Sequence, residues 1–354
     1  MTNGATHPGL AGSGQRVAGG DRDSLAAMTD IHVEVAGRVV RVSSPDKVLF
    51  PDRGWTKRHV VAHYLMCADG AVRGVWRRPT SLKRWPGGVT EDFFFTKRAP
   101  GMMSHSHPVQ FPSAHPGNMP YVEDAADVIE QVQLGVLDLN PWNARIEDLD
   151  HPDELRIDLD PTDGFTFDHC REIAGTIRDL LAEKGLVGLP KTSGSRGIHI
   201  YVRIHPRWDY FEVRRAGLAL ARELERRTGL ATTSWWKEER SGVFIDYNQN
   251  ARDKTIASAY SIRQTGLVST PFRWDELDTI DPRAMTLDGF RARWEAVGDL
   301  TAGIDDSPAD LTPLLDMVLI DESNGLGDAP WPPHYPKMPG EPPRVQPSKR
   351  RMKE

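Results

Sequence analysis

Hydrophobic and polar positions along this chain follow two periods. Strict alternation predicts a hairpin around Gly37 over 33–42 and strands over 154–160, 198–204 and 243–247. Apolar residues with helical spacing predict helices over 57–68, from a capping Asp168 to Gly185, and over 210–227. The order strand, helix, strand, helix, strand between residues 154 and 247 is typical of one sheet unit, so the predicted fold class is mixed α/β.

Domain boundaries follow from where this periodicity stops. Residues 1–28 are rich in Gly, Ala, Thr and Ser and show no apolar period, which predicts a disordered leader. Residues 29–300 carry the predicted elements and are expected to form one catalytic domain. Its N-terminal module is expected over about 29–150 and its catalytic core over about 151–300.

The two ends differ in composition. Met28 directly precedes the first strand-like run, so translation from Met28 rather than Met1 is a hypothesis. Residues 301–354 form a predicted C-terminal extension. It holds eight prolines between Pro330 and Pro347, and because proline cannot donate a backbone hydrogen bond we expect no packed element there. A basic tip, 349–353, closes the chain.

The amino-acid composition adds no new element to this picture, but it excludes several classes of protein. The 354 residues are 39% hydrophobic and 27% charged, which allows a sizeable core and excludes a wholly disordered chain. No apolar run is long enough for a membrane helix, and no secretory signal precedes the first element. Two distant cysteines argue against a disulfide framework or a cysteine zinc site. We therefore expect a cytoplasmic protein.

Positive and negative charges are separated along the chain. Residues 47–98 hold 11 Lys and Arg against 4 Asp and Glu, whereas residues 123–168 hold 14 Asp and Glu against 2 Lys and Arg. The first segment can hold phosphates, and the second can bind metal or be solvated. The net charge of -6 is thus no argument against nucleic-acid binding, although two charged surfaces remain the plain alternative.

Three aspartates on predicted strands are the first candidates for chemistry. Asp158 and Asp160 are two residues apart on one strand, so both carboxylates project from the same face. Asp246 is embedded in an apolar run, where an unpaired carboxylate is costly. Neighbouring carboxylates repel unless a cation lies between them, and hard oxygen ligands suit Mg²⁺ or Mn²⁺. The alternative is a surface aspartate pair and an ion-paired Asp246.

A turn rich in glycine and serine precedes the strand at 198. Backbone N–H groups of the turn, the hydroxyls of Ser193 and Ser195, and the guanidinium of Arg196 can together hold a phosphate. His199 follows, on the face opposite Ile198 and its apolar neighbours. An ordinary turn and a structural histidine are the alternatives.

Three basic residues surround Asp246 in sequence: Arg240, Lys254 and Arg263. They could neutralise a triphosphate. The alternative is an ion pair between Asp246 and one of them.

Six strings in this order resemble the archaeo-eukaryotic primase superfamily and, most closely, the polymerase domain of bacterial ATP-dependent DNA ligase D, the end-joining ligase. They are residues 45–51, 83–88, 157–161, 192–201, 243–250 and 260–263. The resemblance covers about residues 42–294 and implies a primase-polymerase fold whose central sheet carries the three aspartates. Only about 60 residues follow, so we expect a stand-alone polymerase module without a ligase or phosphoesterase domain.

The resemblance implies a role for each matching residue. Asp158, Asp160 and Asp246 would bind two divalent ions, Mn²⁺ or Mg²⁺. The incoming nucleotide would contact Ser193, Ser195, Arg196, His199, Arg240, Lys254 and Arg263. Lys47 and Lys57 would hold the 5′-phosphate across a gap, and Phe94 and Phe95 would stack on the template beside Lys83 and Arg84. One departure is Asn140, where the family usually has His; an amide can form hydrogen bonds but carries no proton charge.

The implied function is a DNA-dependent nucleotidyltransferase that fills short gaps or extends ends in repair by two-metal catalysis and favours ribonucleotides. Its partners would be gapped or broken double-stranded DNA with a 5′-phosphate, and NTP or dNTP. A metal-dependent nuclease on the same carboxylates and a catalytically silent DNA-end-binding module are the alternatives. The pathway stays open: end joining would involve Ku, and gap filling a stand-alone ATP-dependent ligase. In either case we expect a nucleoid-associated protein.

Overall fold

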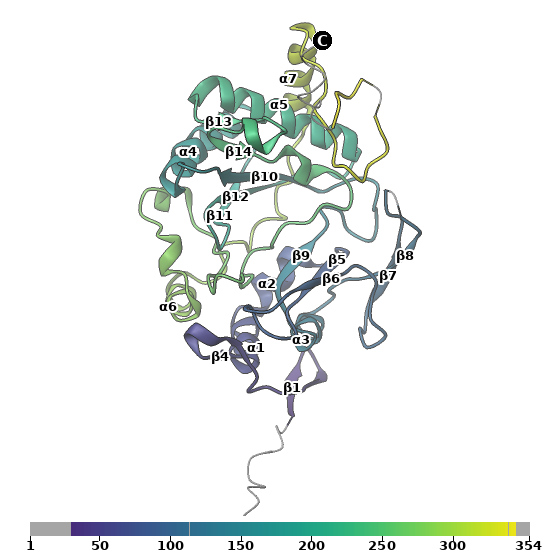
Figure 1. Cartoon of the computed structure of the whole chain (residues 1–354), viewed down its shortest axis with the longest axis vertical. Coiled ribbons are helices and arrows are strands. Elements are labelled where there is room, and N and C mark those ends of the chain that lie inside the picture. The colour runs from purple at the N-terminus through teal and green to yellow at the C-terminus, as the bar shows by residue number, and fades with distance from the viewer. Residues whose placement is uncertain (1–29, 113, 339, 345–354) are drawn as a thin grey trace, which may run out of the picture.

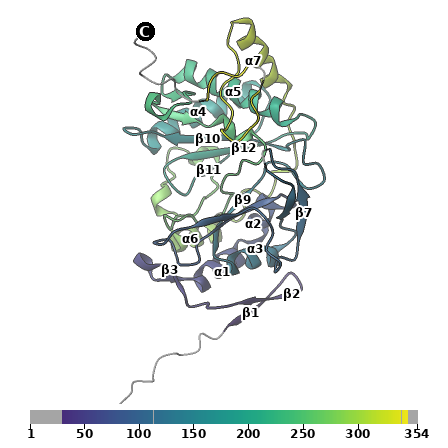
Figure 2. The same cartoon turned by 45° about the vertical axis from the view of Figure 1, so that its right-hand side comes forward.

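Two bodies lie one above the other in the computed structural model, which describes residues 30–112, 114–338 and 340–344 (Figures 1 and 2). The predicted leader, the start at Met1 or Met28, and the basic tip lie outside these residues. The predicted mixed α/β class is confirmed. None of the described helices is both long and apolar enough to cross a membrane. The cytoplasmic location stays a prediction.

The upper body is built on a five-stranded sheet with the order β11-β12-β10-β14-β13. Its strands are β10 (Glu154–Pro161), β11 (Leu189–Thr192), β12 (Ile198–Arg203), β13 (Ala231–Thr232) and β14 (Val243–Ile245). The central strand β10 pairs antiparallel with both β12 and β14. Helices α4 (Phe167–Glu183) and α5 (Tyr210–Thr228) cover one face of the sheet (Figure 1). The apolar side chains of β10 and β12 pack into that face, so the aspartates lie on the other.

Two local predictions in this body need correction. Asp168 does not cap α4: the cap is Thr166, two residues earlier, because Thr166 and the ring of His169 form a capping box. The strand expected over 243–247 ends at Ile245, and Asp246 instead caps a short 3₁₀ turn, Tyr247–Asn250. The carboxylate of Asp246 therefore lies at the end of the strand rather than within it.

The lower body begins with the predicted hairpin, β1 (Ile31–Val35) and β2 (Arg38–Val42). The predicted helix over 57–68 is two helices, α1 (Lys57–Met66) and α2 (Ala68–Val75), which meet at Cys67. A three-stranded sheet has the order β6-β5-β9. The remaining elements are β3 (Val48–Phe50), β4 (Trp55–Thr56), β5 (Thr80–Arg84), β6 (Phe94–Thr96), β7 (Ser106–Val109), β8 (Gly117–Pro120), α3 (Ala125–Gln133) and β9 (Val136–Pro141).

The chain returns from the upper body to complete the lower core. The apolar cluster that contains Val60 of α1 and Leu82 of β5 also contains Tyr260 and Ile262. Phe290, from helix α6 (Leu287–Val297), belongs to the same cluster. The lower body is therefore assembled from two separate stretches of sequence. The division at about residue 150 stays a prediction, with these contacts crossing it.

The C-terminal extension packs against the upper body. Helix α7 (Thr312–Ser323) lies along α5, and the following segment loops down beside α5 (yellow in Figure 1). No helix or strand forms in the described part of residues 330–344, as expected. Trp331 is nevertheless buried, because its ring stacks on Phe211 of α5.

Candidate active site

The three aspartates meet at one pocket. Asp158 and His199 are direct cross-strand partners in β10 and β12, and the backbone N–H of Asp246 donates to the carbonyl oxygen of Asp158 (3.1 Å). Asp158, Asp160 and Asp246 line a cavity of about 290 Å³, together with Arg240, Lys254, Trp235, Phe244, Asn248, Gln249 and Pro332. We call this cavity the carboxylate pocket. The common face predicted for Asp158 and Asp160 is consistent with this geometry, and Asp246 joins them from the end of β14.

None of the three carboxylates is paired with a Lys or Arg side chain within the described residues. Asp158 is 3.3 Å from Nε2 of His199, and Asp246 accepts from the N–H of Asn248 (3.1 Å). The amide of Gln249 bridges them, donating to Asp246 (3.0 Å) and Asp158 (3.4 Å). Gln249 was missed by the sequence reasoning, although it lies within the string 243–250.

This arrangement makes the carboxylates hard to ionise. Burial raises the pKa of Asp158 to about 6. Burial, and then the charge of Asp158, raises the pKa of Asp246 to about 6. The pKa of Asp160 is raised for the same two reasons. A bound cation would reverse this effect, because it favours the charged form of each group.

The donor set of the carboxylate pocket is that of a divalent-ion site. Across the described residues, no three Asp, Glu, His or Cys side chains already converge on one point as metal ligands. The pocket nevertheless offers only hard oxygen donors, and these carry negative charge without a cationic partner, which suits Mg²⁺ or Mn²⁺. The residues therefore fit a divalent cation by chemistry and charge, and its binding is taken up below as a proposal.

Two of the predicted triphosphate ligands line the pocket. The side-chain ammonium of Lys254 makes no hydrogen bond or ion pair with a described residue, and burial lowers its pKa. The guanidinium of Arg240 stacks 3.5 Å from the ring centre of Phe244 and donates to the carbonyls of Ser234 and Trp235. The alternative of an ion pair between Asp246 and one of these bases is not what the structure contains.

The turn before β12 is held by its own side chain. Oγ of Ser193 accepts from the N–H groups of Ser195 (3.1 Å) and Gly197 (3.0 Å), so this hydroxyl shapes the turn. Gly197 lies against β10, and a Cβ there would collide with the carbonyl oxygen of Leu159. The turn is thus seated directly on the strand that carries Asp158 and Asp160.

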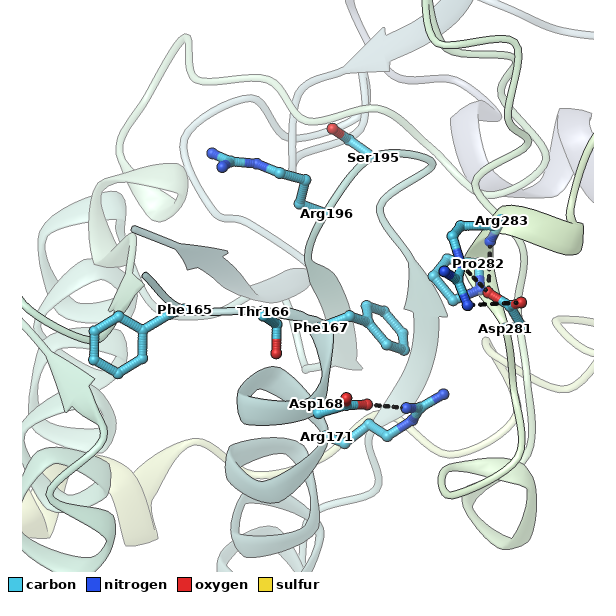
Figure 3. A pocket seen from close by; sticks show the side chains of 10 residues that line it. All are labelled: Phe165, Thr166, Phe167, Asp168, Arg171, Ser195, Arg196, Asp281, Pro282 and Arg283. Atoms are coloured by element: carbon cyan, nitrogen blue, oxygen red, sulfur yellow. Dashed lines mark hydrogen bonds and ion pairs between the residues drawn. The ribbon is translucent and has the colours of Figure 1, made fainter. Parts of the chain in front are cut away.

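A second cavity, of about 570 Å³, opens on the far side of this turn (Figure 3). Ser195 and Arg196 stand at its rim, and Phe165 and Phe167 line it. Arg196 makes no hydrogen bond or ion pair with a described residue, and its charge acts on Asp160.

His199 is held from both sides. Its Nε2 faces Asp158, and its Nδ1 is 2.7 Å from Nζ of Lys191 in the neighbouring strand β11. Nζ of Lys191 also donates to the carbonyl of Ala257 and the hydroxyl of Ser269. Burial lowers the pKa of both Lys191 and His199 well below their usual values. The sequence analysis did not single out Lys191.

Arg263 joins the turn to the lower body. Its Nη1 donates to the carbonyl of Ser193 (3.2 Å), and its Nε is 3.4 Å from Oδ2 of Asp138 in β9. Asn140, two residues further along β9, is buried and donates to the carbonyl of Asp138 (2.9 Å). The position that departs from the family thus lies beside the carboxylate that holds Arg263.

Of the two lysines predicted to hold a 5′-phosphate, Lys57 begins α1 and Lys47 directly precedes β3, and the backbone N–H of Lys57 donates to the carbonyl of Lys47 (2.9 Å). The side chain of Lys57 is buried, and Nζ donates to the carbonyls of Ser43 (2.8 Å) and Gln133 (3.3 Å). Nζ of Lys47 donates to the carbonyl of Pro86. Burial, and then the charge of Lys47, lowers the pKa of Lys57. Neither ammonium has a carboxylate partner among the described residues; we call them the lysine pair.

The predicted template-stacking residues lie on the edge strand β6, which pairs only with β5. Phe94 and Phe95 are 46% and 56% exposed, which is unusual for aromatic side chains. Nζ of Lys83 lies 4.4 Å from the ring centre of Phe93, and Arg84 lies 5.0 Å from that of Phe94. Phe93, which the sequence analysis did not single out, therefore belongs to the same exposed basic and aromatic surface.

Comparisons with known proteins agree on the family. The LigD primase-polymerase domain matches residues 56–301. The multifunctional non-homologous end joining protein LigD of Mycolicibacterium smegmatis is 34% identical over 283 residues, which are 76% of this chain and 36% of that protein. LigD of Pseudomonas aeruginosa is 29% identical over 279 residues, which are 77% and 32% respectively. The chain thus spans about a third of the length of these curated relatives.

A solved structure extends this agreement to three dimensions. The polymerase domain of Mycobacterium tuberculosis ligase D, in complex with DNA, superimposes with a TM-score of 0.70 at 30% identity. The match covers 76% of this chain and 99% of that one. Fold and site together define a nucleotidyltransferase of the primase-polymerase type. The chain belongs to the LigD primase-polymerase domain family.

Proposed function

We propose that this chain is a DNA-dependent nucleotidyltransferase of DNA repair that fills short gaps or extends ends and favours ribonucleotides. The observation that carries the proposal is the carboxylate pocket, in which three carboxylates without a cationic partner adjoin Lys254 and Arg240. Relatives named for non-homologous end joining and a solved relative in complex with DNA support it.

Each group has a place in this reaction. Asp158, Asp160 and Asp246 would hold two divalent ions, Mg²⁺ or Mn²⁺, which would activate the primer 3′-hydroxyl and stabilise the leaving pyrophosphate. Lys254, Arg240 and Arg196 would neutralise the triphosphate as negative charge develops. Ser193, Ser195, His199 and Arg263 would position it, and Asn140 would act through Asp138 on Arg263.

DNA would be held by the lower body. The lysine pair offers two ammonium groups to a 5′-phosphate, and Lys57 lies in the first turn of α1, where the helix dipole also favours an anion. Phe94 and Phe95 would stack on template bases, beside Lys83 and Arg84. Ku or a stand-alone ligase would act before or after this step, depending on the pathway.

Incorporation assays on labelled gapped DNA test the proposal. We expect the primer to be extended only when nucleotides and Mn²⁺ or Mg²⁺ are added, with ribonucleotides preferred and gaps of one to a few nucleotides filled best. Shortening of the primer without nucleotides would mean a nuclease. Tight binding to gapped DNA without either reaction would mean a silent end-binding module, and both results contradict the proposal.

A further inference from the structure

A C-terminal strap, residues 328–338 and 340–344, forms part of the wall of the carboxylate pocket. It lies beyond residue 301, where the match to the family ends. Pro332 lines the pocket directly. Trp235, another lining residue, donates from its indole N–H to the carbonyl of Arg344 (3.2 Å). Two walls of the pocket therefore depend on a segment outside the family match.

The strap is a folded loop with its own internal bonds. The carboxylate of Glu341 accepts from the backbone N–H of Trp331 (2.7 Å) and of Met338 (3.0 Å) and pairs with Arg344. The guanidinium of Arg344 also donates to the carbonyls of Pro332 and Pro336. The indole N–H of Trp331 donates to Asp328 (2.8 Å). These bonds fix the strap's shape, so its contacts with the rest of the protein occur together.

One buried side chain connects the strap to the 3₁₀ turn that Asp246 caps, Tyr247–Asn250. Arg214 of α5 is fully buried. Its guanidinium donates to Oδ1 of Asp328 (2.7 Å) and to the carbonyls of Ala329 (2.8 Å) and Pro330 (3.0 Å). Its Nε donates to Oδ1 of Asn248 (2.7 Å), and the indole of Trp331 lies 4.1 Å from it. Three of its four hydrogen-bond acceptors thus belong to the strap.

Asn248 carries this connection to the metal-binding carboxylate. Its side-chain amide accepts from Arg214 and donates to the carbonyl of Pro330 (3.1 Å), while its backbone N–H donates to Oδ1 of Asp246 (3.1 Å). If the strap left, Arg214 would be a buried cation with most of its acceptors gone, a state too costly to keep. Asn248 would then lose both side-chain partners, and the turn that carries Asp246 would lose its support.

We propose that the C-terminal strap is a positioning element of the carboxylate pocket, which fixes the turn of Asp246 through Arg214 and Asn248 and so tightens divalent-cation binding. The inference rests on the proposed function only in taking this pocket as the metal site. Groups that orient a metal ligand from behind affect binding strongly, by about 10- to 100-fold when removed.

The test is a Mn²⁺ titration of the full-length protein without DNA or nucleotide, with free Mn²⁺ followed by electron paramagnetic resonance. Asp328→Ala removes acceptors of Arg214 and Trp331 without changing any group in the pocket. We expect it to weaken Mn²⁺ binding about 10-fold or more. Affinity for gapped DNA should stay within about twofold, because the proposed DNA-binding groups lie in the lower body. Incorporation should fall at limiting Mn²⁺ and recover at saturating Mn²⁺.

Arg222→Met is the matched control, since Arg222 lies on the same helix and donates to the carbonyl of Gly327 but does not contact Asn248. It should bind Mn²⁺ like the wild type. If Asp328→Ala does not fold, Arg214→Lys keeps the charge but cannot reach all four acceptors, and it should weaken Mn²⁺ binding in the same direction.

Three results would overturn the inference. The first is that folded Asp328→Ala or Arg214→Lys binds Mn²⁺ within about twofold of the wild-type affinity. The second is that release of the strap tightens Mn²⁺ binding or speeds incorporation. The third is that Arg222→Met weakens Mn²⁺ binding as much as Asp328→Ala does. Absence of saturable Mn²⁺ binding in the wild type would overturn it too. A wild type that binds Mn²⁺ but incorporates nothing refutes the proposed function alone, because the titration still decides this inference.

Discussion

The carboxylate pocket and the lysine pair are built on the same plan with opposite charge. In the pocket, the carboxylates have only neutral partners, and partial burial raises the pKa of Asp158 and Asp246 to about 6. In the lysine pair, Lys57 is held by carbonyl oxygens, and burial lowers its pKa. Both are costly to keep without a ligand. By contrast, the buried Arg78 is paired with the carboxylate of Asp153.

The difference between the two sites lies in their supports. Strand β10 carries Asp158 and Asp160, and Asp246 directly follows β14, whereas a short loop holds Lys47 and the first turn of α1 holds Lys57. We conclude that the first site is suited to fixing reacting atoms and the second to positioning a substrate strand. Each prediction below separates these two roles.

The largest expected effect is at the pocket. Asp158→Asn with Asp160→Asn should reduce incorporation about 10³-fold or more, because the ligands of the proposed ions are lost. Affinity for gapped DNA should change by no more than about twofold. Single-turnover incorporation and fluorescence anisotropy measure the two quantities. Asp163→Asn, an exposed carboxylate shortly after β10, is the control. Substantial synthesis by a folded double variant would refute the catalytic assignment.

A smaller and more selective effect is expected at the lysine pair. Lys47→Ala with Lys57→Met should remove most of the affinity that a 5′-phosphate adds to a one-nucleotide gap, about 10-fold, since charge-assisted hydrogen bonds are lost. Affinity is measured with and without the phosphate. Arg58→Ala, next to Lys57 but paired with Asp46, should leave the increment intact. If the double variant weakens both substrates equally, the lysines give only general backbone attraction.

The smallest effect is on stability without ligands. Neutralising either site by Asp246→Asn or Lys57→Met should raise the free energy of unfolding by about 1 kcal/mol. For Asp246 the pKa is about 6 in the folded protein against 3.8 ordinarily, so ionisation penalises the folded state. The gain from Asp246→Asn should therefore be absent below pH 3.8, grow up to about pH 6 and stay constant above.

Denaturant unfolding across this pH range measures the effect. Adding Mn²⁺ should stabilise the wild type and reduce the advantage of Asp246→Asn, without affecting that of Lys57→Met. If the gain in stability from Asp246→Asn is the same at all pH values, the pKa of Asp246 is not raised in the folded protein.

How far the sequence could predict this site depends on the range of the interactions. Alternation along β10 was enough to place Asp158 and Asp160 on one face, because that rule is local. The hydrogen bonds of Gln249, and of Lys191 to Ser269, join residues far apart in sequence, so no local pattern could reveal them. The cap of α4 was misplaced because the ring of His169 completes a box usually formed by Glu or Gln.

The C-terminal extension shows where a correct rule was applied too widely. Proline lacks the N–H that a helix or strand needs, and the described part of residues 330–344 forms neither. Its carbonyl oxygen, however, remains a full acceptor. The carbonyls of Pro330, Pro332 and Pro336 receive hydrogen bonds from arginine side chains, and these bonds hold the segment in place. Packing without a regular element was therefore open to this sequence.

Gly197 sets the distance between the turn that precedes β12 and strand β10. The turn proposed to hold the triphosphate touches β10 at Leu159, between the two aspartates, and the contact leaves room for a hydrogen atom only. The absence of a side chain at Gly197 therefore sets the distance between the proposed phosphate site and the carboxylates. Gly197 has no reactive group, yet its substitution should reduce incorporation as severely as loss of an aspartate. The cause would be misalignment of the triphosphate with the carboxylates rather than loss of a catalytic group.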